Sequence, residues 1–383
     1  MNTFVKIIIF FILIGSLNIQ KSNASEKIKI GLMVPLSGKH KPIGKSIIQS
    51  VRLAINKIGN QKIEIIPKDT EANPAKTLKV AKELEEDGIK IVIGPIFNTN
   101  LIYLDELKNM TFLSLTNKTI KNPKNVISVG INADSQLKAI KKFQKINEMK
   151  NTIFLLPKTD YEKEIKKAIV STNIPLKKLY IYEREPTKLT KQIEKITKYK
   201  ERKLDLKKLI KKYENSDDPN KEKKIEQLKK KDTIGRINFD SVIIADFDES
   251  LKSVTTSLLY TDVSPKKIYF ITLNQWFDKS ILQETSSHPI YFPSIDFENY
   301  NKFSKDYFSK FKEYPNQVSI ICYDLIGLIY YLIYQNNFTI DEKLFVRKNQ
   351  FKGKIGLFEI KENKIHHILN FYMIENNKFK KIF

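Results

Sequence analysis

The sequence predicts an α/β protein of two doubly wound parallel-sheet lobes, joined by hinge crossings and carrying a helical hairpin insertion. From Lys27 onwards, strands of buried type alternate with amphipathic helices. After Thr152 the same alternation begins again, in a unit of similar size. Such alternation is typical of parallel sheets covered by helices on both faces. A lysine-rich helical stretch at 187–232 interrupts the second unit and predicts the insertion.

The first unit alternates strand and helix from its start. The apolar run at 28–35 suits a buried strand, and residues 43–58 carry apolar side chains at the period of an amphipathic helix. The unit is completed by strands at 62–67, 89–93 and 111–115 and by helices at 74–87 and 100–108. A parallel sheet of this kind places ligand sites at the carboxyl ends of its strands.

The second unit repeats the pattern and is followed by two helices. Its strands are expected at 152–156, 178–182, 240–245 and 268–272, with helices starting near 134 and 160. Helices are also expected at 300–314 and 318–334. The second of these is apolar enough to be deeply buried, but Tyr323 and Asp324 interrupt it and its length is marginal for a membrane span.

The domain boundaries follow from these units. Lobe 1 is expected to comprise 27–134 and 276–345, and lobe 2 to comprise 135–275 and 346–383. Within lobe 2, residues 187–232 carry 17 Lys and Arg against 9 Asp and Glu, a net charge of +8. The Asn, Asp and Pro residues at 215–220 predict the turn of a helical hairpin. Two interpretations stay open, a partner-binding arm and an exposed insertion lying on its own domain.

The first 24 residues have the pattern of a secretory signal. Lys6 precedes an apolar run at 7–17, and the small residues Ser22 and Ala24 suit a signal-peptidase site. The run is shorter than the roughly 20 residues of a membrane span. A lipid anchor is not expected, because there is no Cys near the junction to carry it. We therefore expect cleavage near Ala24 and a periplasmic protein, with an uncleaved anchor as the alternative.

Composition argues for a globular chain and against nucleic acid as its partner. Of the 383 residues, 41% are hydrophobic and 11% aromatic, enough for two domains with cores of their own. The formal net charge of +24 comes mostly from Lys spread along the chain, without a basic-aromatic recognition module. Export also removes the usual nucleic-acid partner. An anionic envelope polymer or a membrane face remains a possible target.

The motifs of enzyme chemistry are missing from the sequence. It has no Gly-x-Ser-x-Gly elbow, no Walker loop and no glycine-rich dinucleotide turn. Its four His lack metal-ligand spacing, and adjacent His366 and His367 on a strand would point to opposite faces. The single Cys322 lies in an apolar run and is predicted to be a packed core thiol. We expect no catalytic residue, no cofactor and no metal.

Several motifs together resemble a known family. They are the run at 30–38 (IGLMVPLSG), then Gly44, Lys68-Asp69-Thr70 and Ile93-Gly94-Pro95. In order and spacing these resemble the opening lobe of type I periplasmic binding proteins, the leucine/isoleucine/valine-binding group. Later segments are similar to a narrower branch, the penicillin-binding-protein activators, which share the fold and include regulators of cell-wall synthases. These segments lie at 239–242, 260–263, 274–276, 322–324 and 351–358.

The resemblance implies a ligand cleft between the lobes. Carried onto this chain, the first-lobe loops supply Ser37, Asn98, Thr99, Thr116 and Asn117, and the second lobe supplies Tyr161, Asp246 and Trp276. Amino-acid binders of the family usually place Ser and a small Ser/Ala-Thr pair in the last two first-lobe loops. Here those loops read Phe-Asn-Thr and Leu-Thr-Asn, which departs from that pattern. Each residue also has a plain structural alternative, such as packing for Trp276 or a helix cap for Asn and Thr.

Three function classes follow from this family. The first is a solute receptor that binds a small polar ligand of the amino-acid class, for an ABC-type uptake permease. The second is a regulator that docks on a peptidoglycan synthase, with the helical insertion as its contact surface. The third, an enzyme, is the least favoured. Because one fold serves many functions, only the site can separate the first two.

Overall fold

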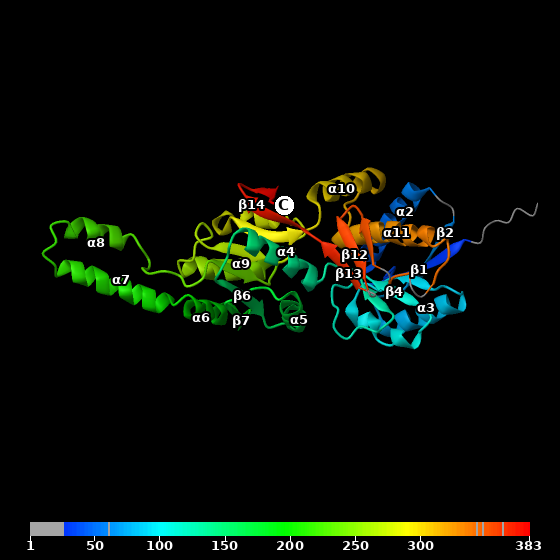
Figure 1. The fold of residues 1–383 in the computed structure, drawn as a ribbon, viewed down its shortest axis with the longest axis horizontal. Coiled ribbons are helices and arrows are strands. Elements are labelled where there is room, and N and C mark those ends of the chain that lie inside the picture. The colour runs from blue at the N-terminus through cyan, green and yellow to red at the C-terminus, as the bar shows by residue number, and fades with distance from the viewer. Residues whose placement is uncertain (1–26, 60–61, 342–343, 347, 362–363) are drawn as a thin grey trace, which may run out of the picture.

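The computed structural model describes residues 27–59, 62–341, 344–346, 348–361 and 364–383. It contains two α/β lobes that lie side by side, with a pair of helices projecting from the far end of the second lobe (Figure 1). The predicted signal segment, 1–24, lies outside the described residues.

The first lobe is built on a five-stranded parallel sheet of order β2-β1-β3-β4-β5. The strands are β1 (Ile28–Val34), β2 (Ile63–Asp69), β3 (Ile91–Ile93), β4 (Thr111–Ser114) and β5 (Val126–Ser128). The helices of the lobe are α2 (Lys41–Ile58), α3 (Pro74–Glu86), α10 (Phe297–Phe311) and α11 (Gln317–Gln335). The carboxyl ends of the parallel strands all reach the same edge of the sheet, which positions their loops together.

The second lobe has a seven-stranded sheet of order β15-β14-β10-β9-β8-β6-β7. Five strands are parallel, namely β6 (Thr152–Pro157), β7 (Lys178–Tyr182), β8 (Ser241–Ile244), β9 (Tyr269–Thr272) and β10 (Ile290–Ser294). The antiparallel edge is formed by β14 (Asn370–Glu375) and β15 (Lys378–Lys381). The helices are α4 (Ala133–Ile146), α5 (Glu162–Thr172), α6 (Pro186–Ile196) and α9 (Asp248–Tyr260). The two-lobe α/β fold is thus the predicted one.

The chain crosses between the lobes three times, and the crossings move two predicted boundaries. β10 pairs with β9 and β14, so residues 276–294 go with the second lobe and not with the first. The third crossing runs through a separate antiparallel sheet of β11 (Asn349–Lys352), β12 (Leu357–Lys361) and β13 (Lys364–Ile368). This sheet lies beside α11 and β5 (Figure 1), so only β14 and β15 of the predicted 346–383 segment join the second lobe. Pro293 within β10 hid this strand from the sequence pattern.

The apolar helix α11 is a core helix. It is the one helix among the described residues that is long and apolar enough to cross a membrane, but 61% of its most apolar window is buried inside the protein. It packs along α2, and Cys322 on it is fully buried, as predicted. Burial raises the pKa of the Cys322 thiol, which makes it a poor nucleophile.

The helix predicted at 100–108 is wrong, because the segment forms two 3₁₀ turns, Asn98–Leu101 and Leu104–Glu106. Tyr103 between them has a left-handed backbone, with φ of 72°. The Asn125 side chain donates to the carbonyls of Leu104 and Leu107 at 2.8 and 2.9 Å. The same carbonyls also accept from Leu107 N and Met110 N at 3.2 and 3.1 Å, so the segment is held as short turns.

The lysine-rich stretch contains three helices with two different roles. α6 packs against α9 on the second lobe. α7 (Tyr199–Glu214) and α8 (Lys221–Lys229) pack on each other and extend away from the lobe (Figure 1). We call α7 and α8 the arm. The prediction of an insertion lying on its own domain therefore fits α6, whereas the arm projects.

Candidate functional site

A cleft of about 780 Å³ lies between the lobes, at the carboxyl ends of strands β4, β6, β8 and β9. The first lobe contributes the loop after β4 and the first residue of α11. The second lobe contributes the loops after its strands and the start of α4. Its polar, charged and aromatic lining includes Asn117, Lys118, Gln136, Lys158, Asp160, Tyr161, Arg184, Asp248, Asn274, Gln275, Trp276, Asp278 and Gln317. Its volume is in the range of small-molecule sites in proteins.

Arg184 is a cleft residue that a buried carboxylate holds in place. Its Nε and Nη2 donate to the Asp246 carboxylate at 3.2 and 2.6 Å. Asp246 is 1% exposed and also accepts a 2.6 Å hydrogen bond from the Tyr182 hydroxyl. Burial and the charge of Asp246 raise the pKa of Tyr182, so its hydroxyl stays a donor. Asp246 thus binds the Nε–Nη2 edge of the guanidinium, and this ion pair leaves Nη1 unused.

Both signs of charge line the cleft. The positive groups are Arg184, Lys118 and Lys158, and Lys158 makes a solvent-exposed contact with Glu183 at 3.2 Å. The negative groups are Asp160, Asp248 and Asp278. Such a cleft can pair with a carboxylate and an ammonium of one molecule, because hydrogen bonds to charged groups are the strong ones.

The floor of the cleft is a fixed hydrogen-bond network at the end of β9. The Asn274 backbone donates to Gln136 at 2.8 Å, and the Asn274 side chain accepts from Trp276 N at 2.9 Å and from Ser294 Oγ at 2.8 Å. Trp276 has a φ of 50°, a costly backbone for a large residue, and it lines the cleft. The network ties α4, β9 and β10 together, so the floor is rigid.

The structure brings four of the predicted ligand residues to the cleft. Asn117, Tyr161 and Trp276 line it directly. Asp246 lies behind the wall and reaches the cleft through Arg184. The Tyr161 hydroxyl is buried and has no hydrogen-bond partner among the described residues. Burial, with Glu164 and Asp134 nearby, raises the pKa of Tyr161, so the phenol stays protonated.

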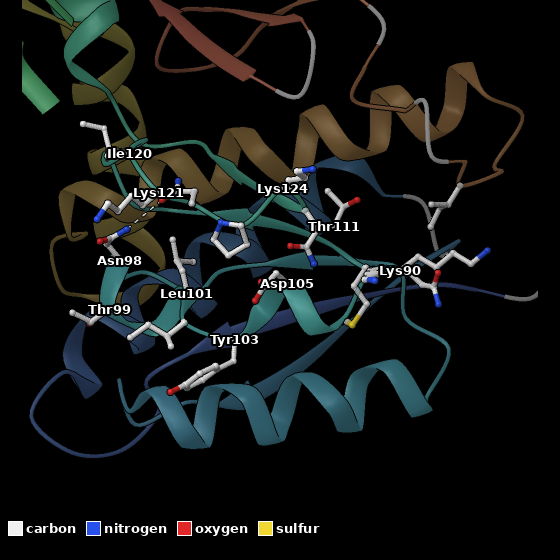
Figure 2. A pocket seen from close by; sticks show the side chains of 18 of the residues that line it. Lys90, Asn98, Thr99, Leu101, Tyr103, Asp105, Thr111, Ile120, Lys121 and Lys124 are labelled. Atoms are coloured by element: carbon white, nitrogen blue, oxygen red, sulfur yellow. Dashed lines mark hydrogen bonds between the residues drawn. The ribbon is translucent and has the colours of Figure 1, made fainter. Parts of the chain in front are cut away.

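The other four predicted residues are used elsewhere. Ser37 donates to Asp69 at 2.6 Å, and Asp69 also accepts from Leu36 N at 2.8 Å, so the Asp-Thr motif closes the turn after β1. Thr116 is buried and its hydroxyl accepts from the backbone of the same loop. Asn98 and Thr99 line a second, wider groove of about 1770 Å³ on the first lobe (Figure 2).

That second groove exists because short turns replace a crossover helix. Figure 2 shows Asn98 and Thr99 on one side and Lys90 on the opposite side, with Asn98 bonded to Asn122 at 3.3 Å. Lys90, Lys121 and Lys124 surround it. The interlobe cleft differs from this groove in having Arg184 paired with a buried carboxylate, which makes it the candidate ligand site.

The described residues contain no metal-binding cluster, and the adjacent His366 and His367 both have lowered pKa values. No cluster of three or more His, Cys, Asp or Glu in this part of the chain could hold a metal ion. Burial lowers the pKa of His367 to about 4, so this imidazole is neutral, and it bonds the Val129 carbonyl at 2.8 Å. Burial also lowers the pKa of His366. Through its bond to Val129, His367 links β13 to the end of β5, where the chain first leaves the first lobe.

Comparison with known proteins points to one family for the first part of the chain. A family model described as periplasmic binding protein matches residues 27–170, which span the first lobe and the start of the second. In this segment and in its two-lobe fold, the chain is similar to type I periplasmic binding proteins. No curated protein sequence matches it.

Solved structures share the fold of this chain at low identity. The LpoA (YraM) C-domain from Haemophilus influenzae, a regulator of PBP1A, is 14% identical, covers 93% of this chain and 100% of its own, and has a TM-score of 0.62. A putative branched-chain amino acid ABC transporter protein from Rhodospirillum rubrum is 12% identical, with coverage of 93% and 100% and a TM-score of 0.68. LivJ from Streptococcus pneumoniae, in complex with isoleucine, is 16% identical, with coverage of 93% and 98% and a TM-score of 0.54.

Sequence reasoning missed the residue that dominates the cleft. Arg184 is one of five arginines in a chain whose positive charge is mostly Lys, and it follows the end of β7 directly. Those two facts together would have singled it out. Its partner Asp246 lies 62 residues away, so nothing local announces the ion pair.

Proposed function

We propose that this chain is an exported, non-enzymatic receptor that binds a small carboxylate-bearing solute of the amino-acid class in its interlobe cleft and delivers it to an ABC-type permease. The observation that carries the proposal is Arg184, fixed by the buried Asp246 at the cleft wall. A guanidinium held in one orientation by a buried carboxylate is preorganised for a second carboxylate on its free edge.

The charges around Arg184 support an amino acid over a simple anion. Lys118 and Lys158 add positive charge on the same cleft, while Asp160, Asp248 and Asp278 supply counter-charge for an ammonium. LivJ, which shares the fold, holds isoleucine. The departure of the first-lobe loops from the usual amino-acid pattern means that the grip on the carboxylate comes from the second lobe.

Thermal-shift and calorimetric titration of the purified protein with the twenty amino acids, benzoate and inorganic phosphate test the proposal. A ligand at 100 times its Kd stabilises the folded state by about 2.7 kcal/mol, a readily measured increase in Tm. Stabilisation by an amino acid supports the proposal. Stabilisation by none of the amino acids at millimolar concentration contradicts it.

Arg184→Ala is expected to weaken binding of the stabilising ligand by about 10- to 100-fold, the value of one or two charge-assisted hydrogen bonds. Arg184→Lys should recover part of the loss, because the charge returns without the planar fork. Arg236→Ala, an exposed arginine in the same lobe, is the matched control and should bind as the unchanged protein does. Equal affinity in Arg184→Ala and Arg236→Ala would remove Arg184 from the site.

The arm favours a second candidate function, docking on a peptidoglycan synthase. The arm's apolar residues Leu206 and Leu228 are buried, and the lysines at 207, 208 and 211 are exposed. Its root is fixed by Arg202, which is 7% exposed and donates to the Thr261 carbonyl at 3.0 Å and to Thr233 Oγ1 at 2.5 Å. A projection with a locked root and a basic surface suits contact with an acidic partner, and the LpoA C-domain regulates PBP1A.

Reversing three arm charges, K207E with K208E and K211E, is expected to weaken binding to a purified penicillin-binding synthase by at least tenfold at low salt. K302E with K305E, on exposed positions of α10, is the matched control and should leave binding unchanged. Surface plasmon resonance at two salt concentrations provides the measurement. Equal loss in both variants would mean non-specific charge attraction, and no binding by the unchanged protein would reject this candidate.

A further inference from the structure

One carboxylate of the second lobe is bound by a loop of the first lobe. Glu164, in the first turn of α5, accepts from Thr119 N at 2.8 Å, from Ile120 N at 2.7 Å and from Thr119 Oγ1 at 3.0 Å. Lys167, one turn further along α5, adds a 3.4 Å bond to the same hydroxyl. Thr119 and Ile120 follow β4, so these four bonds join the lobes directly, apart from the chain crossings.

Burial shows that this contact is built into the interface. Glu164 is 6% exposed although it is a carboxylate on a surface helix. A buried carboxylate is costly unless donors satisfy it, and here two backbone amides and a hydroxyl do so. In Figure 1, α5 lies on the side of the second lobe that faces the first.

The bound loop is also a wall of the ligand cleft. Asn117 and Lys118, directly before Thr119, line the cleft from the first lobe. Tyr161, three residues before Glu164, lines it from the second lobe. The contact therefore lies where two cleft walls meet, and it must separate when the lobes open on that side.

We propose that Glu164 is an interlobe latch that keeps the ligand-free protein with its lobes together on the α5 side. Water replaces these hydrogen bonds when the lobes part, so their net free energy is modest and the latch is reversible. Because lobe closure in two-lobed receptors is a hinge motion, a contact made only in the closed arrangement shifts the population toward it. Glu164 thus raises the fraction of ligand-free molecules whose lobes are already closed.

Glu164→Gln tests the latch without any ligand. The glutamine is nearly isosteric: its carbonyl can still accept from the Thr119 and Ile120 amides, and its NH₂ can face the Thr119 hydroxyl. The variant therefore removes the negative charge that strengthens these hydrogen bonds. We expect hydrogen exchange of the Thr119 and Ile120 amides to speed up by about 10- to 100-fold. We also expect a larger radius of gyration in small-angle X-ray scattering, as the open population grows.

Glu162→Gln is the matched control. Glu162 lies in the same helical turn, but it pairs with Lys166 at 2.6 Å within the second lobe. This variant should keep the exchange rates and the radius of gyration of the unchanged protein. Thr119→Ala, which removes only the hydroxyl, should fall between the two, and circular dichroism verifies that each variant is folded.

Unchanged exchange and an unchanged radius in Glu164→Gln would overturn the latch. A further consequence rests on the proposed function, namely that Glu164→Gln changes the affinity for the solute without touching Arg184. If no solute binds at all, the proposed function fails while the latch is still decided by exchange and scattering.

Discussion

Asp324→Asn is expected to remove a fall in stability that the unchanged protein shows between about pH 4 and pH 7. Asp324 lies on α11, is 2% exposed, and accepts from Lys354 N and Ile355 N at 2.7 Å each. Burial raises its pKa to about 7, although the two amides and the Lys354 charge lower part of that shift. It fastens the third lobe crossing to the core helix, and a Cβ at Gly353 would lie 2.2 Å from its Oδ2.

The sign of the effect follows from the direction of the shift. A carboxyl whose pKa is higher in the folded state than in the unfolded chain stabilises the fold fully below pH 4. It loses that contribution as the pH rises to about 7. A shift of this size corresponds to about 4 kcal/mol as an order of magnitude. His367 works the other way, because its lowered pKa, about 4, costs stability as the pH falls below about 6.5.

The comparison of Asp324→Asn with the unchanged protein isolates the Asp324 contribution, since both chains keep His367. Urea unfolding at pH 4, 5, 6 and 7 gives the two free-energy curves. At pH 4 both side chains are neutral and each points one donor, O–H or NH₂, at a backbone N–H, so the two chains should differ by no more than about 1 kcal/mol. As the pH rises to 7 the variant should become the more stable chain, by up to about 4 kcal/mol. Parallel curves would show that Asp324 does not titrate in this range.

The sequence predicted the fold where each signal was local. Buried strands such as Ile28–Val34 and Thr152–Pro157 alternate with helices whose apolar faces have a clear period, and the structure contains them. β5 was missed because its three residues include Ser128 and lack the apolar run of β3, and β10 was missed because it contains Pro293. The helix expected at 100–108 was wrong, because the segment forms two 3₁₀ turns with a left-handed Tyr103 between them.

The candidate site was predictable only in part, and for the same reason. Residues that directly follow a parallel strand, such as Asn117 and Trp276, line the cleft because strand ends gather at one edge of a sheet. Arg184 and Glu164 depend on partners 62 and 45 residues away, and their roles appear only when the lobes are assembled. Contacts between residues far apart in the sequence produce no local pattern from which they could be predicted.

Asp246→Ala is expected to destabilise the fold by about 2–4 kcal/mol and to lower the affinity of the cleft as far as Arg184→Ala does. The Tyr182 hydroxyl would be left buried without its acceptor, which costs about 1–3 kcal/mol. The Arg184 side chain is 46% exposed and can turn to water, so its share of the stability loss is small. The loss of affinity arises because the guanidinium is no longer held in one orientation.

A double-mutant cycle separates positioning from direct contact. If Asp246 acts through Arg184, then adding Asp246→Ala to Arg184→Ala should weaken ligand binding little further, a coupling of about 1–3 kcal/mol. Tyr182→Phe is the matched control, since it removes the hydroxyl and leaves the Asp246–Arg184 pair in place. It should cost about 1 kcal/mol of stability and leave the affinity nearly unchanged. Fully additive losses of affinity from Asp246→Ala and Arg184→Ala would contradict the positioning role. If Asp246 acts only by orienting Arg184, its removal has no further effect on affinity once Arg184 is gone.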